Sequence, residues 1–153
     1  MRNGSNTLIV DTNVLVYVYD PRDRFKQDRA SFTLDRLLGS GGAALSVQCL
    51  TEFVSAVTGR LPERLSSEQA LERVETFMRL CTIFDLTQEV VLAGCQAAVR
   101  YQLSIWDALI WAVANVNGVT AILTEDAEHD RVIGDVRYLN PFSPAFDLDA
   151  LRV

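Results

Sequence analysis

Three carboxylates stand alone in long uncharged stretches of this chain. Asp11 is the only charged residue between positions 3 and 19, Glu52 the only one between 39 and 59, and Asp107 the only one between 101 and 124. Their neighbours are largely apolar, and an ionised carboxylate is costly to bury unless it is paired or coordinates a metal. No Lys, Arg or His lies nearby in the sequence to pair with them. We therefore expect the fold to bring all three together on a shared divalent cation.

Short apolar runs alternate along the chain with longer segments of helical periodicity. Strands are predicted at 7–10, 43–45, 82–86, 120–123 and 136–139, and helices at 24–38, 46–58, 66–80, 87–102 and 104–117. Residues 14–19 fit either a strand or a helix. Such alternation predicts an α/β fold, in which a parallel sheet of four or five strands is flanked by helices. Without a repeat or linker, residues 1–153 suit a single domain with a core at 7–142 and a C-terminal tail at 143–153.

The predicted connectivity brings acidic residues to one edge of the sheet. Asp11 directly follows the first strand, and Asp126 follows the fourth. Glu52 lies in the helix after the second strand, and Asp107 lies in the first turn of the helix before the fourth. Sites in parallel α/β sheets form at the carboxyl ends of strands, so all four acids can converge there.

Each acid also has a purely structural interpretation. Asp11 can begin a turn, and Asp107 can complete a capping box with Ser104. Glu52 and Asp126 can be solvated surface acids. The four together favour a site, while each one alone leaves the alternative open.

Composition narrows the class of protein. The apolar fraction of 49% and the charged fraction of 22% are typical of a globular chain, and the net charge of −6 argues against indiscriminate nucleic-acid binding. The polar Met1–Asn6 segment does not resemble a signal peptide, and the apolar window Ile105–Leu123 contains Asp107, so no membrane span is expected. The three cysteines show no CxxC spacing, which indicates reduced core thiols in a cytoplasmic protein.

Four segments resemble a known family. The motifs "LIVDTNVLVYVYD", "LTEFVSAV", "LSIWDALIWAVA" and "AILTEDAEHD…VRYLNPF" are similar, in this order, to PIN domains of the VapC type, the toxin ribonucleases of bacterial toxin–antitoxin pairs. The resemblance extends over Leu8–Phe142 and implies a single PIN-like domain that cuts RNA with Mg²⁺ or Mn²⁺.

The resemblance also implies roles for particular residues. Asp11, Glu52, Asp107 and Asp126 would be the catalytic metal ligands, and Asp130 is the second choice for the last acid. Asn13 and Thr124 match polar positions that support the acids. The resemblance also implies an antitoxin partner.

Other parts of the sequence bear on RNA and on protein partners. The densest basic group, Arg22, Arg24, Lys26 and Arg29, could contact RNA, although a solvated helix face fits it equally well. Trp106, Trp111 and Phe142 could form a homodimer or antitoxin interface; for the two tryptophans we favour the core. The single histidine, His129, fits a surface loop better than a substrate contact.

Competing functions fit the sequence less well. A haloacid-dehalogenase-like phosphatase would need a second Asp where Asn13 stands, and a response-regulator receiver would need a Lys after its last strand, whereas the only Lys is Lys26. The remaining alternative is a PIN-like RNA- or protein-binding module without significant nuclease activity. Loss of acids would be its signature, and all four are present.

Overall fold

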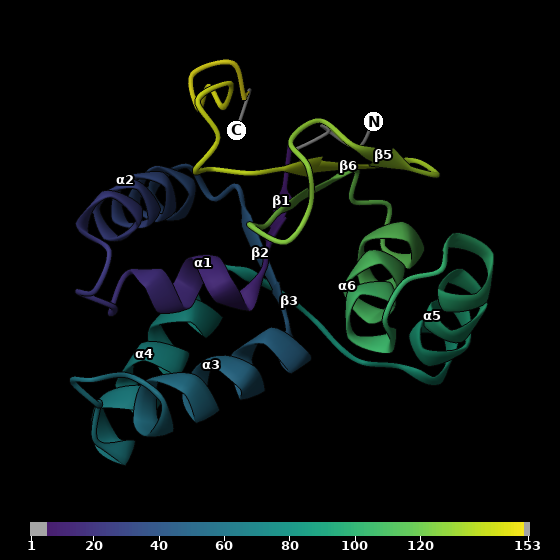
Figure 1. Cartoon of the computed structure of the whole chain (residues 1–153). Coiled ribbons are helices and arrows are strands. Elements are labelled where there is room, and N and C mark those ends of the chain that lie inside the picture. The colour runs from purple at the N-terminus through teal and green to yellow at the C-terminus, as the bar shows by residue number, and fades with distance from the viewer. Residues whose placement is uncertain (1–5, 152–153) are drawn as a thin grey trace.

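One mixed sheet forms the centre of the molecule (Figure 1). The structure is a computed structural model and describes residues 6–151. The strand order is β3-β2-β1-β4-β6-β5, and every neighbouring pair is parallel except β5 with β6. The strands are β1 (Leu8–Val10), β2 (Ala43–Ser46), β3 (Thr82–Phe84), β4 (Ala121–Leu123), β5 (Val132–Ile133) and β6 (Val136–Leu139).

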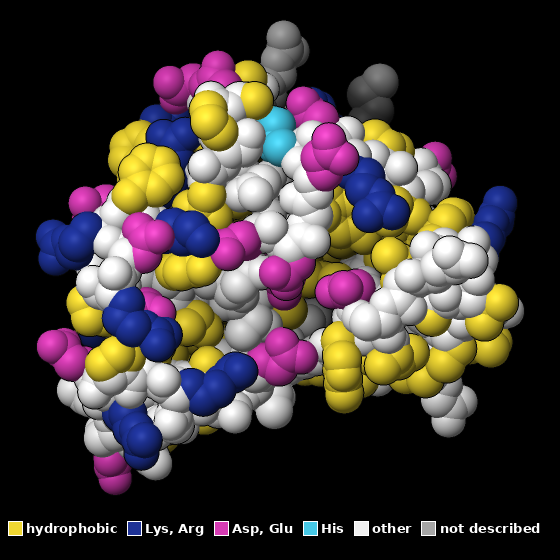
Figure 2. Space-filling view, in the orientation of Figure 1, with side chains coloured by type: hydrophobic (Ala, Val, Ile, Leu, Met, Phe, Trp, Pro, Cys, Tyr) yellow, Lys and Arg dark blue, Asp and Glu magenta, His cyan; other side chains and the backbone are white. Residues whose placement is uncertain are grey.

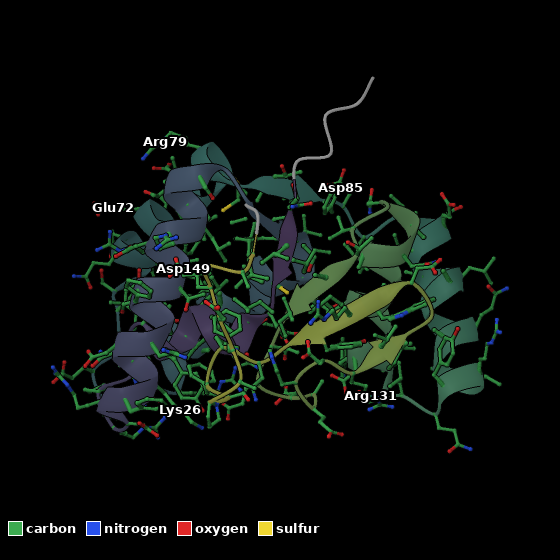
Figure 3. All side chains as sticks on the ribbon, turned by 90° about the horizontal axis from the view of Figure 1, so that it is seen from above. Lys26, Glu72, Arg79, Asp85, Arg131 and Asp149 are labelled. Atoms are coloured by element: carbon green, nitrogen blue, oxygen red, sulfur yellow. The ribbon has the colours of Figure 1, made fainter. Side chains whose placement is uncertain are left out.

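Helices cover both faces of this sheet. They are α1 (Thr12–Tyr17), α2 (Arg24–Ser40), α3 (Val47–Gly59), α4 (Ser67–Leu80), α5 (Gln88–Tyr101) and α6 (Ile105–Val116). Helices α1 to α4 lie on one side and α5 with α6 on the other, as both views show (Figures 1 and 3). The predicted α/β architecture is therefore confirmed.

The two faces of the sheet carry separate cores because successive strand residues point in opposite directions. In β1, Leu8 and Val10 pack against α1 to α4, whereas Ile9 packs against α5 and α6. All three β1 side chains are buried, which explains why this strand reads as a continuous apolar run.

Helix boundaries follow the capping residues in the sequence. Ser46 begins α3 by accepting a hydrogen bond from the backbone N–H of Cys49, and Ser66 forms a capping box with Gln69 at the start of α4. Asp11 caps α1 by accepting from the backbone N–H of Thr12, and the ambiguous segment 14–19 proves to be largely helical. A side chain that ends a strand and caps the next helix fixes the turn between them.

Several detailed expectations were wrong. Strand β5 was not predicted, because two residues paired through a tight turn at Gly134 carry no periodic signal. Trp111 is buried as expected, but Trp106 is 64% exposed, since it lies in the first turn of α6 before the buried stretch begins. Only Cys49 is a buried thiol, because Cys81 is half-buried and Cys95 faces outward on α5.

Two other expectations concern membranes and the N-terminus. Within residues 6–151, no helix combines the length and the apolar character needed to cross a bilayer. The Met1–Asn6 segment lies almost entirely outside the described residues.

The close approach of α5 and α6 gives a test of this packing. A Cβ added at Gly94 would lie 2.9 Å from Leu109 Cδ2 and 3.5 Å from its Cα. We expect Gly94→Val to lower the free energy of unfolding by about 1–3 kcal/mol in urea titrations. The control is Gly39→Ala in α2, where nothing lies within 4 Å and stability should hold or rise by up to about 1 kcal/mol. Equal free energies of unfolding for the two variants would contradict the close packing of α5 against α6.

Candidate active site

Asp11 is fixed where the central strand β1 ends. Its backbone N–H donates to Leu123 O at 2.9 Å. Its Oδ1 accepts from the Thr12 backbone N–H at 2.7 Å, and its Oδ2 accepts from Thr124 Oγ1 at 2.8 Å. Both carboxylate oxygens are thus oriented by groups from the ends of two adjacent strands.

Glu52 reaches the same region from α3. Its Oε2 accepts from Thr12 Oγ1 at 3.0 Å, and its Oε1 accepts from Gln48 Nε2 at 2.9 Å. Thr12 therefore connects two of the acids, since its backbone holds Asp11 and its hydroxyl holds Glu52.

Asp126 is positioned by the two residues expected to support the acids. Asn13 Nδ2 donates to Asp126 Oδ2 at 3.1 Å and to Thr124 Oγ1 at 3.3 Å. The backbone N–H of Asp126 donates to Thr124 Oγ1 at 3.1 Å. Asn13 and Thr124 therefore link Asp126 to Asp11.

Asp107 approaches from the other side of the sheet. It lies in the first turn of α6, where its backbone N–H donates to Ser104 Oγ at 3.2 Å, so Ser104 caps the helix. Among residues 6–151, the Asp107 carboxylate does not complete the capping box with a return bond to the Ser104 backbone. Together with Asp11 and Asp126, it lines a small hollow of about 50 Å³. A larger hollow of about 370 Å³ is lined by Asp11, Glu52 and Asp126. Two adjoining hollows therefore share Asp11 and Asp126, and acidic side chains gather there in Figure 2.

The four acids offer oxygen atoms only, which hard cations such as Mg²⁺ prefer. None of the four forms an ion pair with a Lys, Arg or His among residues 6–151. Over the same residues, however, no three acidic, His or Cys side chains are gathered closely enough to hold a metal ion as they stand. The carboxylate oxygens of the four acids are suitable ligands for such an ion. In the structure, however, they lie farther apart than ligands that share one ion.

Asp11 is the acid of the site whose pKa the protein environment raises most clearly. Burial raises the pKa of Asp11 from 3.8 to about 6, and hydrogen bonds from Thr124 and Thr12 offset part of that effect. The negative charges of Asp126 and Glu52 add smaller increases. Desolvation is thus the main cause of the raised pKa of Asp11, and repulsion among the acids is a minor one.

The apolar sequence around the acids suggested that they would be buried, but the structure buries them to different degrees. Asp11 and Glu52 are half-buried, whereas Asp107 and Asp126 are exposed. The apolar neighbours of Asp107 fill the core below it, and its own side chain lies at the rim of the small hollow.

Asp130 and His129 lie apart from the two hollows. Asp130 forms an ion pair with Arg137 and approaches His129 Nε2 at 3.6 Å. His129 Nδ1 accepts from the Asn140 backbone N–H at 3.1 Å. These contacts hold the loop before β5, so the geometry favours Asp126 over Asp130 as the fourth acid.

The four basic residues that were candidates for RNA contact have different roles in the structure. Arg22 lines the larger hollow but forms a bidentate pair with Asp20. Lys26 donates to Glu125, next to Asp126, and Figure 3 places it at the edge of the molecule that also carries Arg131. Arg29 donates to the backbone oxygens of Pro141 and Phe146, a structural role, and Arg24 begins α2.

Sequence reasoning missed several residues of the larger hollow, namely Thr12, Val16, Tyr17, Asp20, Ala56, Arg60 and Leu61. Arg60 is the most informative of them, because no ion pair involves it in the described part of the chain. It follows the end of α3, about two helical turns beyond Glu52, and that spacing was the only signal available.

The family model of the PIN domain matches residues 8–134. No curated protein matches the sequence significantly.

Solved structures share the fold at low sequence identity. A toxin–antitoxin complex from Klebsiella pneumoniae has a TM-score of 0.63 at 17% identity, covering 88% of this chain and 98% of that one. VapBC2 from Rickettsia felis, bound to a promoter DNA fragment, has a TM-score of 0.62 at 17% identity, with coverage of 86% and 96%. VapC20 from Mycobacterium tuberculosis, described as a sarcin–ricin loop cleaving toxin, has a TM-score of 0.57 at 18% identity, with coverage of 76% and 87%.

The raised pKa of Asp11 gives a stability test that needs no substrate. Because the folded pKa lies above the unfolded value, the stabilising contribution of protonated Asp11 is complete below about pH 4 and is lost as the pH rises through about 6. In EDTA at about pH 7.5, Asp11→Asn should therefore raise the free energy of unfolding by about 1–3 kcal/mol.

The measurement is urea denaturation at several pH values. The difference between Asp11→Asn and wild type should shrink as the pH falls from about 7 to about 4. Asp35→Asn, an exposed acid on α2, serves as the control. A variant that is less stable than wild type at neutral pH would show that the buried carboxylate carries no such cost.

Proposed function

The chain belongs to the PIN domain family, and from this premise we propose that it is a metal-dependent endoribonuclease that hydrolyses RNA phosphodiester bonds. The observation that carries the proposal is the placement of Asp11 and Asp126 between two adjoining hollows that also contain Glu52 and Asp107. A cluster of oxygen donors without protein counter-charges suits divalent cations and phosphate chemistry.

The four acids would hold Mg²⁺ or Mn²⁺. When bound, the cation would neutralise charge on the phosphoryl oxygen and make water a better nucleophile at neutral pH. Asp11 is pre-oriented by Thr12 and Thr124, so it would contribute to binding without reorganisation. Glu52 keeps lone pairs beyond its two hydrogen bonds and would accept the proton of the attacking water.

Positive charge near the acids would position the substrate backbone. Arg60 and Arg22 line the larger hollow with Asp11 and Glu52. The pairing of Arg22 with Asp20 offsets its charge, so Arg60 is the better candidate for a phosphate contact.

We further propose that the protein is the toxin of a toxin–antitoxin pair acting in the cytoplasm. Support comes from its fold neighbours, which include toxin–antitoxin complexes. A cognate antitoxin and a homodimer are the corresponding partners. The alternative is a binding module without nuclease activity, and one observation supports it: the acids among residues 6–151 are arranged more openly than a metal site requires.

Cleavage of an RNA panel separates these functions. The purified chain is incubated with tRNA, rRNA and unstructured RNA in Mn²⁺, Mg²⁺ or EDTA. We expect metal-dependent cleavage, and a loss of at least about 100-fold in Asp11→Asn and Asp107→Asn. Asp126→Asn should lose activity similarly, while Asp130→Asn should retain it because Asp130 pairs with Arg137 outside the hollows. Cleavage that survives in the Asp11 variant would point to a contaminating nuclease.

Arg60 provides a second test of substrate contact. Arg60→Ala should raise KM about tenfold with little change in kcat, because a backbone contact outside the reacting bond mainly affects binding. The matched control is Arg36→Ala, since Arg36 is exposed and paired with Asp149 on the C-terminal tail. Steady-state cleavage at two salt concentrations gives the measurement, and a smaller salt dependence in the Arg60 variant is expected. A change in kcat alone would reject the phosphate role.

A further inference from the structure

A third hollow adjoins the acidic group on the side away from Arg60. Its volume is about 710 Å³, and its lining residues are Val47, Gln48, Thr51, Glu52, Leu86 and Trp106. None of them is basic, and the lining combines apolar side chains with one large aromatic ring. The proposed function leaves this hollow without a role.

Trp106 differs sharply in exposure from the other tryptophan of this protein. It is 64% exposed, whereas Trp111, one and a half turns further along α6, is 7% exposed. From Ala108 to Ala114 every residue of α6 is buried, so the exposure begins abruptly at the helix start. Leu86, which is 40% exposed, lines the same hollow as the ring and extends its apolar surface.

The position of this hollow relative to the acids suggests what it binds. Glu52 lines both this hollow and the acidic hollow of about 370 Å³, and Trp106 directly precedes Asp107. A polymer whose scissile phosphate lies among the acids can therefore reach Trp106 with its adjacent nucleotide.

The charge of the lining selects which part of that nucleotide fits. Glu52 repels a phosphate and no Lys or Arg lines the hollow, so the sugar–phosphate backbone has no partner there. A nucleobase has a flat face that stacks on an aromatic ring, and single-stranded RNA offers such unstacked bases. In Figure 2, basic side chains lie mainly to the left of the acidic group and hydrophobic ones to its lower right, over α5 and α6.

We propose that Trp106 is a base-stacking platform for a nucleotide next to the scissile bond, so that the site takes single-stranded or loop RNA. This inference rests on the proposed function for its orientation, because the acids define where the scissile bond lies. Stacking itself needs neither metal nor cleavage and can be measured apart from them.

The chain contains its own reporter for this contact. It has two tryptophans, and Trp111 is buried with its Nε1 donating to Ile133 O at 2.9 Å. Quenching of tryptophan fluorescence by added RNA therefore reports on Trp106. The probe is a single-stranded oligoadenylate of about seven nucleotides, compared with an abasic oligomer of equal charge, both in EDTA.

We expect the oligoadenylate to quench wild-type fluorescence and the abasic oligomer to leave it unchanged. In anisotropy titrations with labelled oligomers, Trp106→Ala should bind oligoadenylate about 5- to 100-fold more weakly and the abasic oligomer equally well. Trp106→Phe keeps a stacking surface, so its affinity should fall only about two- to threefold. Phe32→Ala, at a 55% exposed aromatic on α2, is the control and should bind like wild type.

Other outcomes would overturn the inference. Equal binding of oligoadenylate by Trp106→Ala and wild type, or equal weakening of both oligomers, would exclude stacking. A change in self-association alone, or in capture of a cognate antitoxin alone, would assign the hollow to a protein partner. Base-dependent binding without any cleavage in Mn²⁺ would reject the nuclease proposal while leaving the stacking role in place.

Discussion

The register between two parallel strands determines where the acids meet. Val10 of β1 pairs with Leu123 of β4, so the next residues, Asp11 and Thr124, become neighbours as the strands end. The hydrogen bond from Thr124 Oγ1 to Asp11 Oδ2 is a direct result of that register. A shift of one residue would turn Asp11 to the other face of the sheet and remove the link to Asp126 through Asn13. Local polar contacts at the site therefore depend on the apolar packing of β1.

That packing also sets the electrostatic character of the site. The strand residues that directly precede Asp11 and Thr124, Val10 and Leu123, are fully buried, and this apolar environment raises the pKa of Asp11. The same desolvation strengthens any interaction of Asp11 with a cation or a phosphate-bound ion. Desolvation of Asp11 destabilises the free protein, but it favours binding of a cation, because the charge of the cation replaces the lost hydration.

The sequence determined those parts of the fold in which local chemistry and burial agree. The strand β1 and the capping residues Ser46 and Ser66 were predictable because each acts on its own neighbours. The placement of Asp11 beside Asp126 was predictable because parallel connectivity brings strand ends together. The two-residue strand β5 was not, since its pairing with β6 depends on a turn and on tertiary contacts.

Exposure was harder to infer than position. Trp106 and Trp111 share one helix and one apolar sequence context, yet only the second faces the sheet. Asp107 has the same apolar neighbours and still lies at a rim, because a first-turn side chain can project past the end of the core. Periodicity specifies which residues share a helix face, but the position of the helix end relative to the sheet decides which of them remain open.

Glu125 illustrates why the acids of one short motif differ in role. It lies next to Asp126, but its Oε1 accepts from Lys26 Nζ and from the Tyr17 hydroxyl, each at 3.0 Å. Its charge is therefore already offset within the protein, while Asp126 is held only by the neutral groups of Asn13 and Thr124. Lys26 in turn lies over the rings of Tyr17 and Phe142, which secures α2 beside the site. A carboxylate that is oriented but not neutralised keeps its charge for a cation, and this distinction separates Asp126, like Asp11 and Glu52, from Glu125.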